Sequence, residues 1–252
     1  MLELENVTLQ YQKPNGGLHT VLDDISLNIE QGERWAVIGP SGCGKSSLLH
    51  LLAGLQAPAS GQVHYQKAPL TGPDKEISVI LQEYGLFPWK TVEQNVALPL
   101  ILQKKNKKEI KEKTTEMLQK LGLEEHRKKF PTALSGGQRQ RIAIGRSLIA
   151  SPKVLLMDEP FSALDALTRE NLQNLVLDLC EQQNLTLVLV THNIEESIFL
   201  GQKIAVFSDN SGKIAHIAEN LRSGEHSYRG TEAFYKQCQQ LRGWIGGAEI
   251  EK

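Results

Sequence analysis

Residues 39–47 read GPSGCGKSS, in which Gly39, Gly44, Lys45 and Ser46 have the spacing of a phosphate-binding loop. The apolar segment WAVI precedes the loop and a helical segment follows it, which is the context that such a loop requires. Glycines let backbone N–H groups face phosphate oxygens, while a lysine neutralises the outer phosphates and a serine hydroxyl can bind Mg²⁺. The alternative, a strand-to-helix turn without a ligand, leaves Lys45 and Ser46 unexplained. We therefore expect ATP at Gly39, Pro40, Ser41, Gly42, Cys43, Gly44, Lys45, Ser46 and Ser47.

A second group of chemical residues is the carboxylate pair Asp158 and Glu159, which ends the apolar segment VLLMDEP. Open α/β sheets bind ligands at the carboxyl ends of their strands. Adjacent residues of a strand point to opposite faces, so one carboxylate can serve the metal and the other the attacking water. We assign Asp158 to Mg²⁺, through a water molecule, and Glu159 to the water. An exposed acidic pair is the alternative, and the phosphate loop upstream argues against it.

A third segment, LSGGQRQR at residues 134–141, places Ser135 where it can cap a helix that starts near Gly137. Its two glycines would expose N–H groups to an anion. Taken alone, a serine and two glycines before a helix are usually only a cap. Since the chain already has one phosphate loop, a second cradle is useful if it serves an ATP held by another copy of the chain. The cradle would comprise Ser135, Gly136, Gly137 and Gln138.

The elements that must position these residues follow from hydrophobic periodicity. Alternating apolar residues in residues 7–11 and 25–29 predict antiparallel strands. Continuous apolar runs predict buried parallel strands at WAVI, SVIL, KVLLM, LTLVLV and KIAVFS. Helical patterns lie between them, at SSLLHLLAG, ended by Gly54, and at TRENLQNLVLDLCEQQ. The sequence therefore predicts an α/β fold with a parallel sheet and an N-terminal antiparallel β subdomain.

Between Tyr84 and Ser147 the strand signal is replaced by helical patterns, which begin with a Thr-x-x-Gln capping box at Thr91. We expect one domain over residues 1–252: a core from residues 1–83 and 148–210, a helical insertion at 84–147, and a short extension at 211–252 that docks on the core. The basic run KKNKKEIKEK is interleaved with Glu109 and Glu112, which favours a solvated helix face over a nucleic-acid patch.

The composition argues against a nucleic-acid partner, a membrane-spanning segment and a disulfide framework. The 252 residues contain 28 Lys and Arg against 29 Asp and Glu, which gives no global electrostatic case for a nucleic-acid partner. No run approaches ~20 apolar residues and the N-terminus lacks a leader pattern, so we expect a cytoplasmic protein. Cys43, Cys180 and Cys238 are far apart, which fits reduced thiols. A helix N-terminus could lower the pKa of Cys43, but a tolerated loop position is favoured over a redox switch.

Taken together, GPSGCGKSS, LSGGQRQR, LLMDEP, SALD and His192 resemble the ATP-binding-cassette (ABC) ATPases over nearly the whole chain. The resemblance implies a RecA-like P-loop NTPase core and a nucleotide held between the phosphate loop of one subunit and the signature of its partner. It also implies that Tyr11 stacks on adenine, Gln82 senses Mg²⁺ and γ-phosphate, Asp165 acts across the dimer and His192 contacts γ-phosphate. Tyr11 could instead be a half-buried aromatic beside Val7 and Leu9. Asn193 stands where family members commonly have Asp.

Within that family, LFPWKTV and MDEPFSALDALTRENLQ resemble the ATPase subunits of bacterial importers of nitrate, sulfonates and taurine. The resemblance implies a peripheral protein on the cytoplasmic face of the membrane, an integral membrane permease that docks near Gln82 to Val92, and an extracytoplasmic solute-binding protein as an indirect partner. The nearby Tyr84, Leu86, Phe87 and Trp89 would form this docking surface or pack the insertion on the core. Alternatives are a soluble ABC ATPase and a nucleotide-dependent switch that does not hydrolyse.

Overall fold

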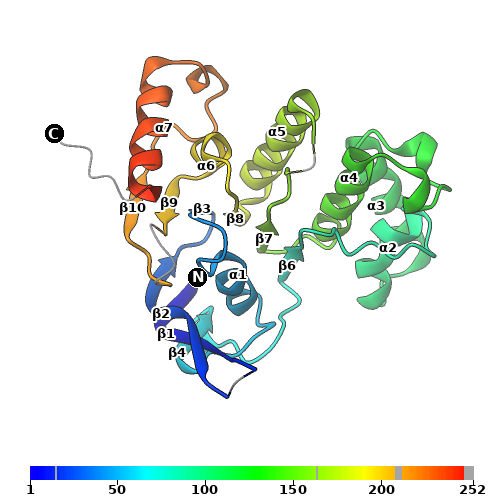
Figure 1. Ribbon diagram of the computed structural model, residues 1–252. Helices are drawn as coiled ribbons and strands as arrows, with labels where there is room; N and C mark the ends of the chain where they lie inside the picture. The colour runs from blue at the N-terminus through cyan, green and yellow to red at the C-terminus, as the bar shows by residue number, and fades with distance from the viewer. Residues whose placement is uncertain (15, 163, 208–211, 247–252) are drawn as a thin grey trace.

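The computed structural model describes residues 1–14, 16–162, 164–207 and 212–246 (Figure 1). Its main sheet has the strand order β10-β9-β3-β8-β7-β6. Within the described ranges, five strands run parallel: β3 (Arg34–Ile38), β6 (Ile77–Ile80), β7 (Val154–Asp158), β8 (Thr186–Val190) and β9 (Lys203–Val206). The apolar runs of β3, β7 and β8 are fully buried, as predicted, because these strands lie inside the sheet. The run at β6, an edge strand, is only partly buried, and its last residue, Leu81, is exposed. The short edge strand β10 (His216–Glu219) is antiparallel and was not predicted.

The N-terminal subdomain is a second, antiparallel sheet of order β2-β1-β4-β5, with β1 (Leu2–Gln12), β2 (Leu18–Ile29), β4 (Ser60–Tyr65) and β5 (Ala68–Pro69). Leu2, Leu4, Val7 and Leu9 face the interior, with a register shift between Leu4 and Val7 that keeps all four on one face. They join a buried cluster with α1 (Lys45–Leu52) and one face of the main sheet. The predicted α/β fold with an antiparallel subdomain is therefore confirmed. The strands β4 and β5 have weak sequence patterns and were not predicted.

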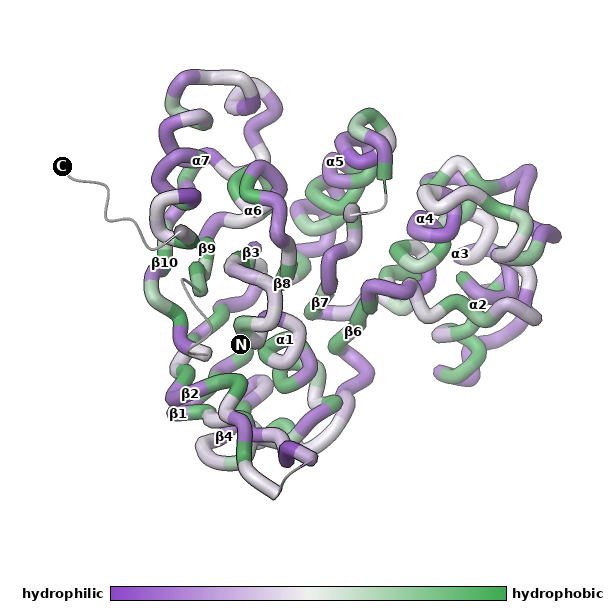
Figure 2. Tube along the Cα trace, viewed as in Figure 1, coloured by the Kyte–Doolittle hydropathy of each residue, from purple (hydrophilic) through white to green (hydrophobic). Residues whose placement is uncertain are grey.

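The helical insertion contains α2 (Val92–Leu102), α3 (Lys107–Lys120), the 3₁₀ turns η1 (Glu124–His126) and η2 (Pro131–Ala133), and α4 (Gly136–Leu148). The capping box predicted at Thr91 is present at the start of α2. Figure 2 shows α2 coloured mostly as hydrophobic, and part of its apolar surface faces outward at Ile101 and Leu102. The basic run lies largely on α3, where Glu109 pairs with Lys105 and Lys113 on the surface.

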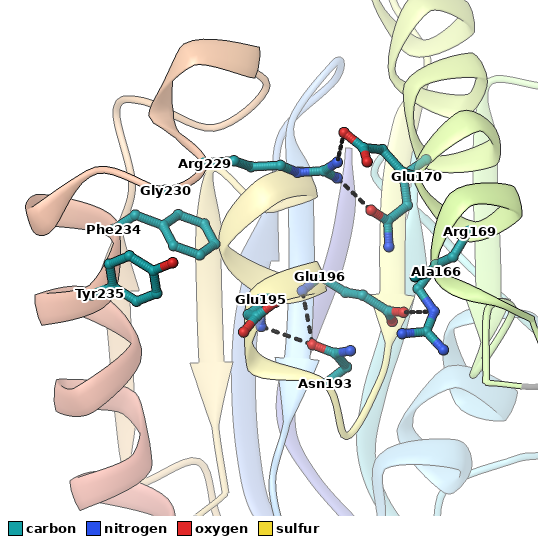
Figure 3. Close-up of a pocket in the computed structure, with 11 residues that line it drawn as sticks. Ala166, Arg169, Glu170, Asn193, Glu195, Glu196, Arg229, Gly230, Phe234 and Tyr235 are labelled. Carbon is teal, nitrogen blue, oxygen red and sulfur yellow. Dashed lines mark hydrogen bonds and ion pairs between the residues drawn. The ribbon is translucent and has the colours of Figure 1, made fainter.

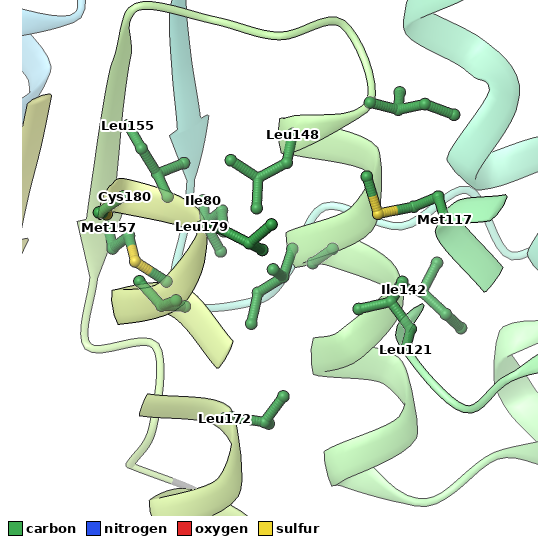
Figure 4. Packing of buried hydrophobic residues seen from close by; sticks show 14 of the residues in the cluster. Ile80, Met117, Leu121, Ile142, Leu148, Leu155, Met157, Leu172, Leu179 and Cys180 are labelled. Carbon is green, nitrogen blue, oxygen red and sulfur yellow. The ribbon is translucent and has the colours of Figure 1, made fainter. Parts of the chain in front are cut away.

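Helix α4 connects the insertion to the core. Leu148, at its end, lies in one buried cluster with Ile80 of β6 and Leu155 of β7, while Ile142 contributes to the same cluster beside Met117 of α3 (Figure 4). The two parts therefore share one hydrophobic core, which favours a fixed relative position. The subdivision at residues 84 and 147 stays a prediction.

The remaining helices are α5 (Ala166–Gln183), α6 (Ile194–Leu200), the turn η3 (His226–Tyr228) and α7 (Glu232–Ile245). The C-terminal extension docks on the core, since Phe234 and Leu241 of α7 are buried with Ile38 and Ile198. Ala163 of the SALD segment, Ser208 of the predicted fifth strand, the predicted boundary at 210 and residues 247–252 lie outside the described residues. No helix in the described ranges is long and apolar enough to cross a bilayer.

Candidate nucleotide site

The phosphate loop joins the end of β3 to the start of α1, so its backbone leads directly into a helix N-terminus. Gly44 caps that helix with φ 104°, in the left-handed region, and a Cβ on it would lie 2.7 Å from the carbonyl oxygen of Val21. Only glycine fits both conditions. Gly42 also has a positive φ, but the space beside it is open. The loop therefore has the backbone that anion binding requires.

Lys45 occupies the centre of the loop. Its side chain is buried, with 7% exposure, and its ammonium donates hydrogen bonds to the carbonyl oxygens of Gly39 at 2.9 Å and Pro40 at 2.7 Å. A buried ammonium needs such acceptors, and phosphate oxygens are stronger ones because they are charged. The loop therefore fits a polyphosphate whose oxygens would replace these carbonyls as acceptors for the Lys45 ammonium.

Cys43 lies beside Lys45, with its Sγ 3.8 Å from Nζ. Burial raises the pKa of the Cys43 thiol, and the charge of Lys45 offsets this only in part. The helix N-terminus alone suggests a lowered pKa for Cys43. That prediction is wrong, because desolvation of the buried thiol has the larger effect. The inference of an inert loop position agrees with this environment.

Asp158 and Ser46 form the oxygen-rich part of the site. Asp158 is buried at the end of β7 and accepts a hydrogen bond from the Ser46 side chain. Burial raises the pKa of Asp158, and the Ser46 hydrogen bond opposes that shift. A carboxylate and a hydroxyl at the edge of a phosphate loop are the donor set that Mg²⁺ prefers. These residues fit the metal that the sequence implies.

Glu159 and His192 meet at the ends of two neighbouring strands. Asp158 pairs with Val190 across β7 and β8, and the Glu159 N–H donates to the Val190 carbonyl at 2.8 Å. His192 Nδ1 lies 3.2 Å from Glu159 Oε2, and both side chains reach solvent. Glu159 has φ 45°, which is uncommon for a residue with a Cβ. The strand register thus brings together the two residues expected to act at the γ-phosphate.

Tyr11 lies beside the far end of the phosphate loop. It is 41% exposed, unlike Val7 and Leu9, so it does not share their buried face. Its hydroxyl donates to Gln56 Oε1 at 2.8 Å and lies 3.4 Å from Ser47 Oγ. An exposed ring beside the loop leaves a face available for stacking.

The LSGGQ signature forms the first turn of α4. Ser135 is the N-cap: its Oγ accepts from the Gln138 N–H at 3.3 Å, while Gln138 Oε1 accepts from the Ser135 N–H at 3.0 Å. Gln138 Nε2 also lies 2.8 Å from His126 Nε2. The helix starts at Gly136, one residue before the predicted start. Figure 1 shows the helical insertion set apart from α1, so the signature does not belong to its own chain's phosphate loop.

Asp165 has a local role in the structure, as the N-cap of α5. Its Oδ1 accepts the Thr168 N–H at 3.0 Å, and this hydrogen bond lowers the pKa of Asp165. A Cβ on Gly137 would lie 2.9 Å from the Thr168 methyl group. The starts of α4 and α5 are therefore in close contact, which places Asp165 near the signature of the same chain.

Gln82 is exposed in the turn that follows β6. Arg146 of α4 holds the next part of this turn, because its guanidinium donates to the carbonyl oxygens of Tyr84 and Gly85, both at 2.7 Å. Sequence reasoning missed Arg146, since a single arginine in a helix gives no signal of a long-range contact.

Asn193 caps α6 by accepting from the N–H groups of Glu195 and Glu196. An amide therefore supplies the helix cap at this position as a carboxylate would.

The aromatic segment after Gln82 is partly buried and partly exposed. Tyr84 and Leu86 pack against the main cluster, whereas Trp89 is 70% exposed and makes an edge contact with Phe87. A groove of about 280 Å³ lies beside it; its lining residues are Glu83, Tyr84, Leu86, Pro88, Pro131, Thr132 and Arg139. Packing of the insertion on the core therefore explains Tyr84 and Leu86, and the docking role of the exposed part stays a prediction.

Comparison with known proteins identifies the family. Residues 22–162 match the family described as ABC transporter. The chain belongs to this family. The aliphatic sulfonates import ATP-binding protein SsuB of Bacillus subtilis is 45% identical over 79% of this chain and 77% of its own length. The taurine import ATP-binding protein TauB of Roseobacter denitrificans is 42% identical over 84% and 80%, and the nitrate import ATP-binding protein NrtC of Synechococcus elongatus is 41% identical over 87% and 33%.

Two solved structures of the ATP-binding cassette MJ0796 share the fold of this ABC ATPase. A dimeric post-hydrolysis state bound to ADP and Pi has a TM-score of 0.79 and 32% identity, and covers 87% of this chain and 98% of the other. A second dimeric structure has a TM-score of 0.80 and 33% identity with the same coverage. The predicted function, an ATP-binding and ATP-hydrolysing subunit of an ABC importer, is confirmed, and the soluble alternative is not.

Proposed function

We propose that this ABC ATPase powers import of a small solute of the nitrate, sulfonate and taurine class. The support comes from its relatives, which are import ATP-binding proteins for aliphatic sulfonates, taurine or nitrate. An ATPase subunit does not itself bind the solute, so the solute class rests on analogy with the relatives. The protein would work peripherally on the cytoplasmic face of the membrane, below a permease, and only indirectly with a solute-binding protein.

The observation that supports the chemistry best is the contact between Glu159 and His192 beside a buried Asp158. In the proposed mechanism Glu159 accepts a hydrogen bond from the attacking water, and His192 donates to the γ-phosphate. Lys45 transfers its hydrogen bonds from the loop carbonyls to the phosphates. Ser46 and Asp158, the latter through water, would hold Mg²⁺ with Gln82. When bound, the metal stabilises negative charge on the phosphates.

The complete reaction centre would require two copies. Ser135 and the N–H groups after it start α4 in the helical insertion, away from the phosphate loop of the same chain. A second copy in a two-fold arrangement would bring this helix terminus to the γ-phosphate of its partner, where a positive dipole end stabilises an anion. Tyr11 would stack on the adenine, and Asp165 would lie at the interface between the copies.

The permease would dock on the segment from Gln82 to Val92. Trp89 provides a large exposed aromatic ring, and the adjacent groove contains apolar residues such as Leu86 and Pro88. Exposed aromatic residues beside an apolar groove are typical anchors of protein interfaces. Because Arg146 joins this segment to α4, a permease bound here would be coupled through Arg146 to the helix that begins with the signature.

The importer function can be tested in membranes that contain the cognate permease. In co-purification, wild-type chain should be retained with the permease, while Trp89→Ala should lose at least about tenfold in retained protein. Tyr235→Ala, an exposed aromatic residue on α7, is the matched control and should behave as wild type. If Trp89→Ala is retained normally, the docking surface is wrong. If the wild-type chain supports no ATP-dependent uptake of nitrate, a sulfonate or taurine, the solute class is wrong.

A further inference from the structure

A polar cavity of about 250 Å³ lies between α5, α6 and α7, outside the nucleotide site (Figure 3). Among its lining residues, Glu196 of α6 is only 5% exposed. A buried carboxylate is costly unless it is paired and hydrogen-bonded. Glu196 is not one of the residues proposed to bind or hydrolyse ATP, so its contacts need another explanation.

One contact of Glu196 leads to the histidine loop. The Thr191 hydroxyl donates to Glu196 Oε2 at 2.7 Å, and the Asn193 N–H donates to the same hydroxyl oxygen at 3.0 Å. Both residues flank His192. Burial raises the pKa of Glu196, while Thr191, Arg169 and His192 each lower it. The carboxylate is therefore part of the electrostatic surroundings of His192 and holds the backbone on which the imidazole is mounted.

The other contact leads to the loop after Glu159. Arg169 Nε lies 3.6 Å from Glu196 Oε1, and Figure 3 shows the two side chains pointing toward each other from α5 and α6. The same guanidinium donates to the carbonyl oxygen of Phe161 at 3.3 Å and to that of Leu164 at 2.8 Å. Phe161 follows Glu159 by two residues, and Leu164 immediately precedes Asp165. Arg169 thus holds both ends of the turn that connects these two residues.

We propose that Arg169 and Glu196 are positioning residues for ATP hydrolysis, which together fix the His192 loop relative to the turn between Glu159 and Asp165. Neither side chain touches the expected position of the phosphates. Their effect would be on the alignment of Glu159 and His192, where a displacement of about 1 Å can cost a hundredfold in rate. The inference rests on the roles proposed above for those two residues.

A second ion pair in the same cavity provides a matched control. Arg229 pairs with Glu170 at 2.9 Å, packs over the Phe199 ring and hydrogen-bonds Gln173. These contacts tie the C-terminal extension to α5 and α6 but involve no residue of the two loops. Glu170→Gln and Glu196→Gln are therefore the same chemical change in one cavity, but only Glu196 has contacts that lead to the nucleotide-site loops.

The test measures phosphate release at saturating ATP and Mg²⁺, and ATP binding by equilibrium titration, on the full chain. Glu196→Gln can still accept from Thr191 but loses the ion pair, so kcat should fall at least about tenfold while the Kd for ATP stays within about threefold. Arg169→Gln should behave alike. The double variant should be no slower than the slower single variant, because the two residues act as a pair. Glu170→Gln should keep wild-type kcat.

The proposal is overturned if either folded Gln variant keeps kcat within twofold of wild type, if the effects of the two substitutions simply multiply, or if Glu170→Gln is equally slow. Circular dichroism and thermal unfolding establish that each variant is folded. If Glu196→Gln does not fold, Arg169→Gln, which is more exposed, decides the question alone. Hydrolysis by Glu159→Gln is measured in parallel. If that variant stays active, the proposed catalytic role of Glu159 is refuted, whereas the comparison of Glu196→Gln with Glu170→Gln still tests the positioning role.

Discussion

The carboxylate of Glu159 and the imidazole of His192 face each other across the ends of β7 and β8, with Oε2 and Nδ1 3.2 Å apart. The register Asp158 to Val190 and the hydrogen bond from Glu159 N–H to Val190 set this distance through the backbone. Both side chains are partly exposed, so neither contributes much to the hydrophobic core. Substitutions at these positions should therefore change chemistry more than folding.

Glu159→Gln should leave ATP binding within about threefold of wild type and lower hydrolysis by roughly 10²–10⁴-fold, because an amide cannot act as a base toward water. Phosphate release and equilibrium titration measure the two quantities. Lys45→Ala is the contrasting variant: it should weaken ATP binding itself, since it removes the buried ammonium of the loop. Near-normal turnover by Glu159→Gln would exclude Glu159 as the base.

Ser135 has two separable roles, as a helix cap and as part of the proposed cradle for the partner's ATP. Ser135→Ala should cost about 1 kcal/mol of stability through the lost cap. Ser135→Asp should keep the cap and the stability, yet prevent ATP-dependent dimerisation, because its charge would face a phosphate. Light scattering in a Glu159→Gln background measures the dimer. Dimerisation of the Asp variant at wild-type ATP concentrations would contradict the two-copy site.

A substitution of Gly54, which lies outside the nucleotide site, should change the stability of the fold. It has φ +66°, and a Cβ would lie 2.2 Å from the backbone oxygen of Gly72. Gly54→Ala should destabilise the fold by about 2–4 kcal/mol through backbone strain and the clash. Gly72→Ala is the control, since the space around its Cβ position is open and its φ is not positive. Urea denaturation of both variants measures the difference, and equal stabilities would show that the backbone relaxes freely.

The pH dependence of stability should reflect Asp158. Burial raises its pKa above the ordinary value of 3.8, so its charged form destabilises the folded nucleotide-free chain. This penalty is fully present above the folded pKa and disappears as the pH falls through the folded pKa to below 3.8. Asp158→Asn should therefore be more stable than wild type at neutral pH, with a difference that shrinks in acid. Denaturation at several pH values measures this, and a constant difference would contradict it.

The sequence predicts the parts of this protein that have local signals. The five apolar strand runs, the capping box at Thr91, the helix cap at Ser135 and the phosphate loop all depend on residues within one short segment, and each lies where expected or within a residue or two of it. Glu159 and His192 are each expected at the carboxyl end of a parallel strand, whereas their proximity depends on the pairing of β7 with β8, which only the structure reveals.

Contacts between distant segments could not be predicted in this way. Arg146 reaches the carbonyl of Tyr84, and Arg169 joins Glu196, across separations that leave no periodic pattern. The pKa of Cys43 likewise depends on how much surrounding structure covers it, which a helix terminus alone does not reveal. The short strands β5 and β10 are specified by neighbours rather than by their own residues.

The guanidinium of Arg146 has a mechanical consequence. By donating hydrogen bonds to the carbonyls of Tyr84 and Gly85, it attaches the turn after Gln82 to the C-terminal part of α4. The opposite end of this helix is the Ser135 turn. A displacement of the aromatic residues in that turn would move α4 as a rigid body and so shift its N-terminal end. If the permease docks and the copies pair as proposed, a displacement of this turn would be transmitted along α4 to the turn that faces the partner's ATP.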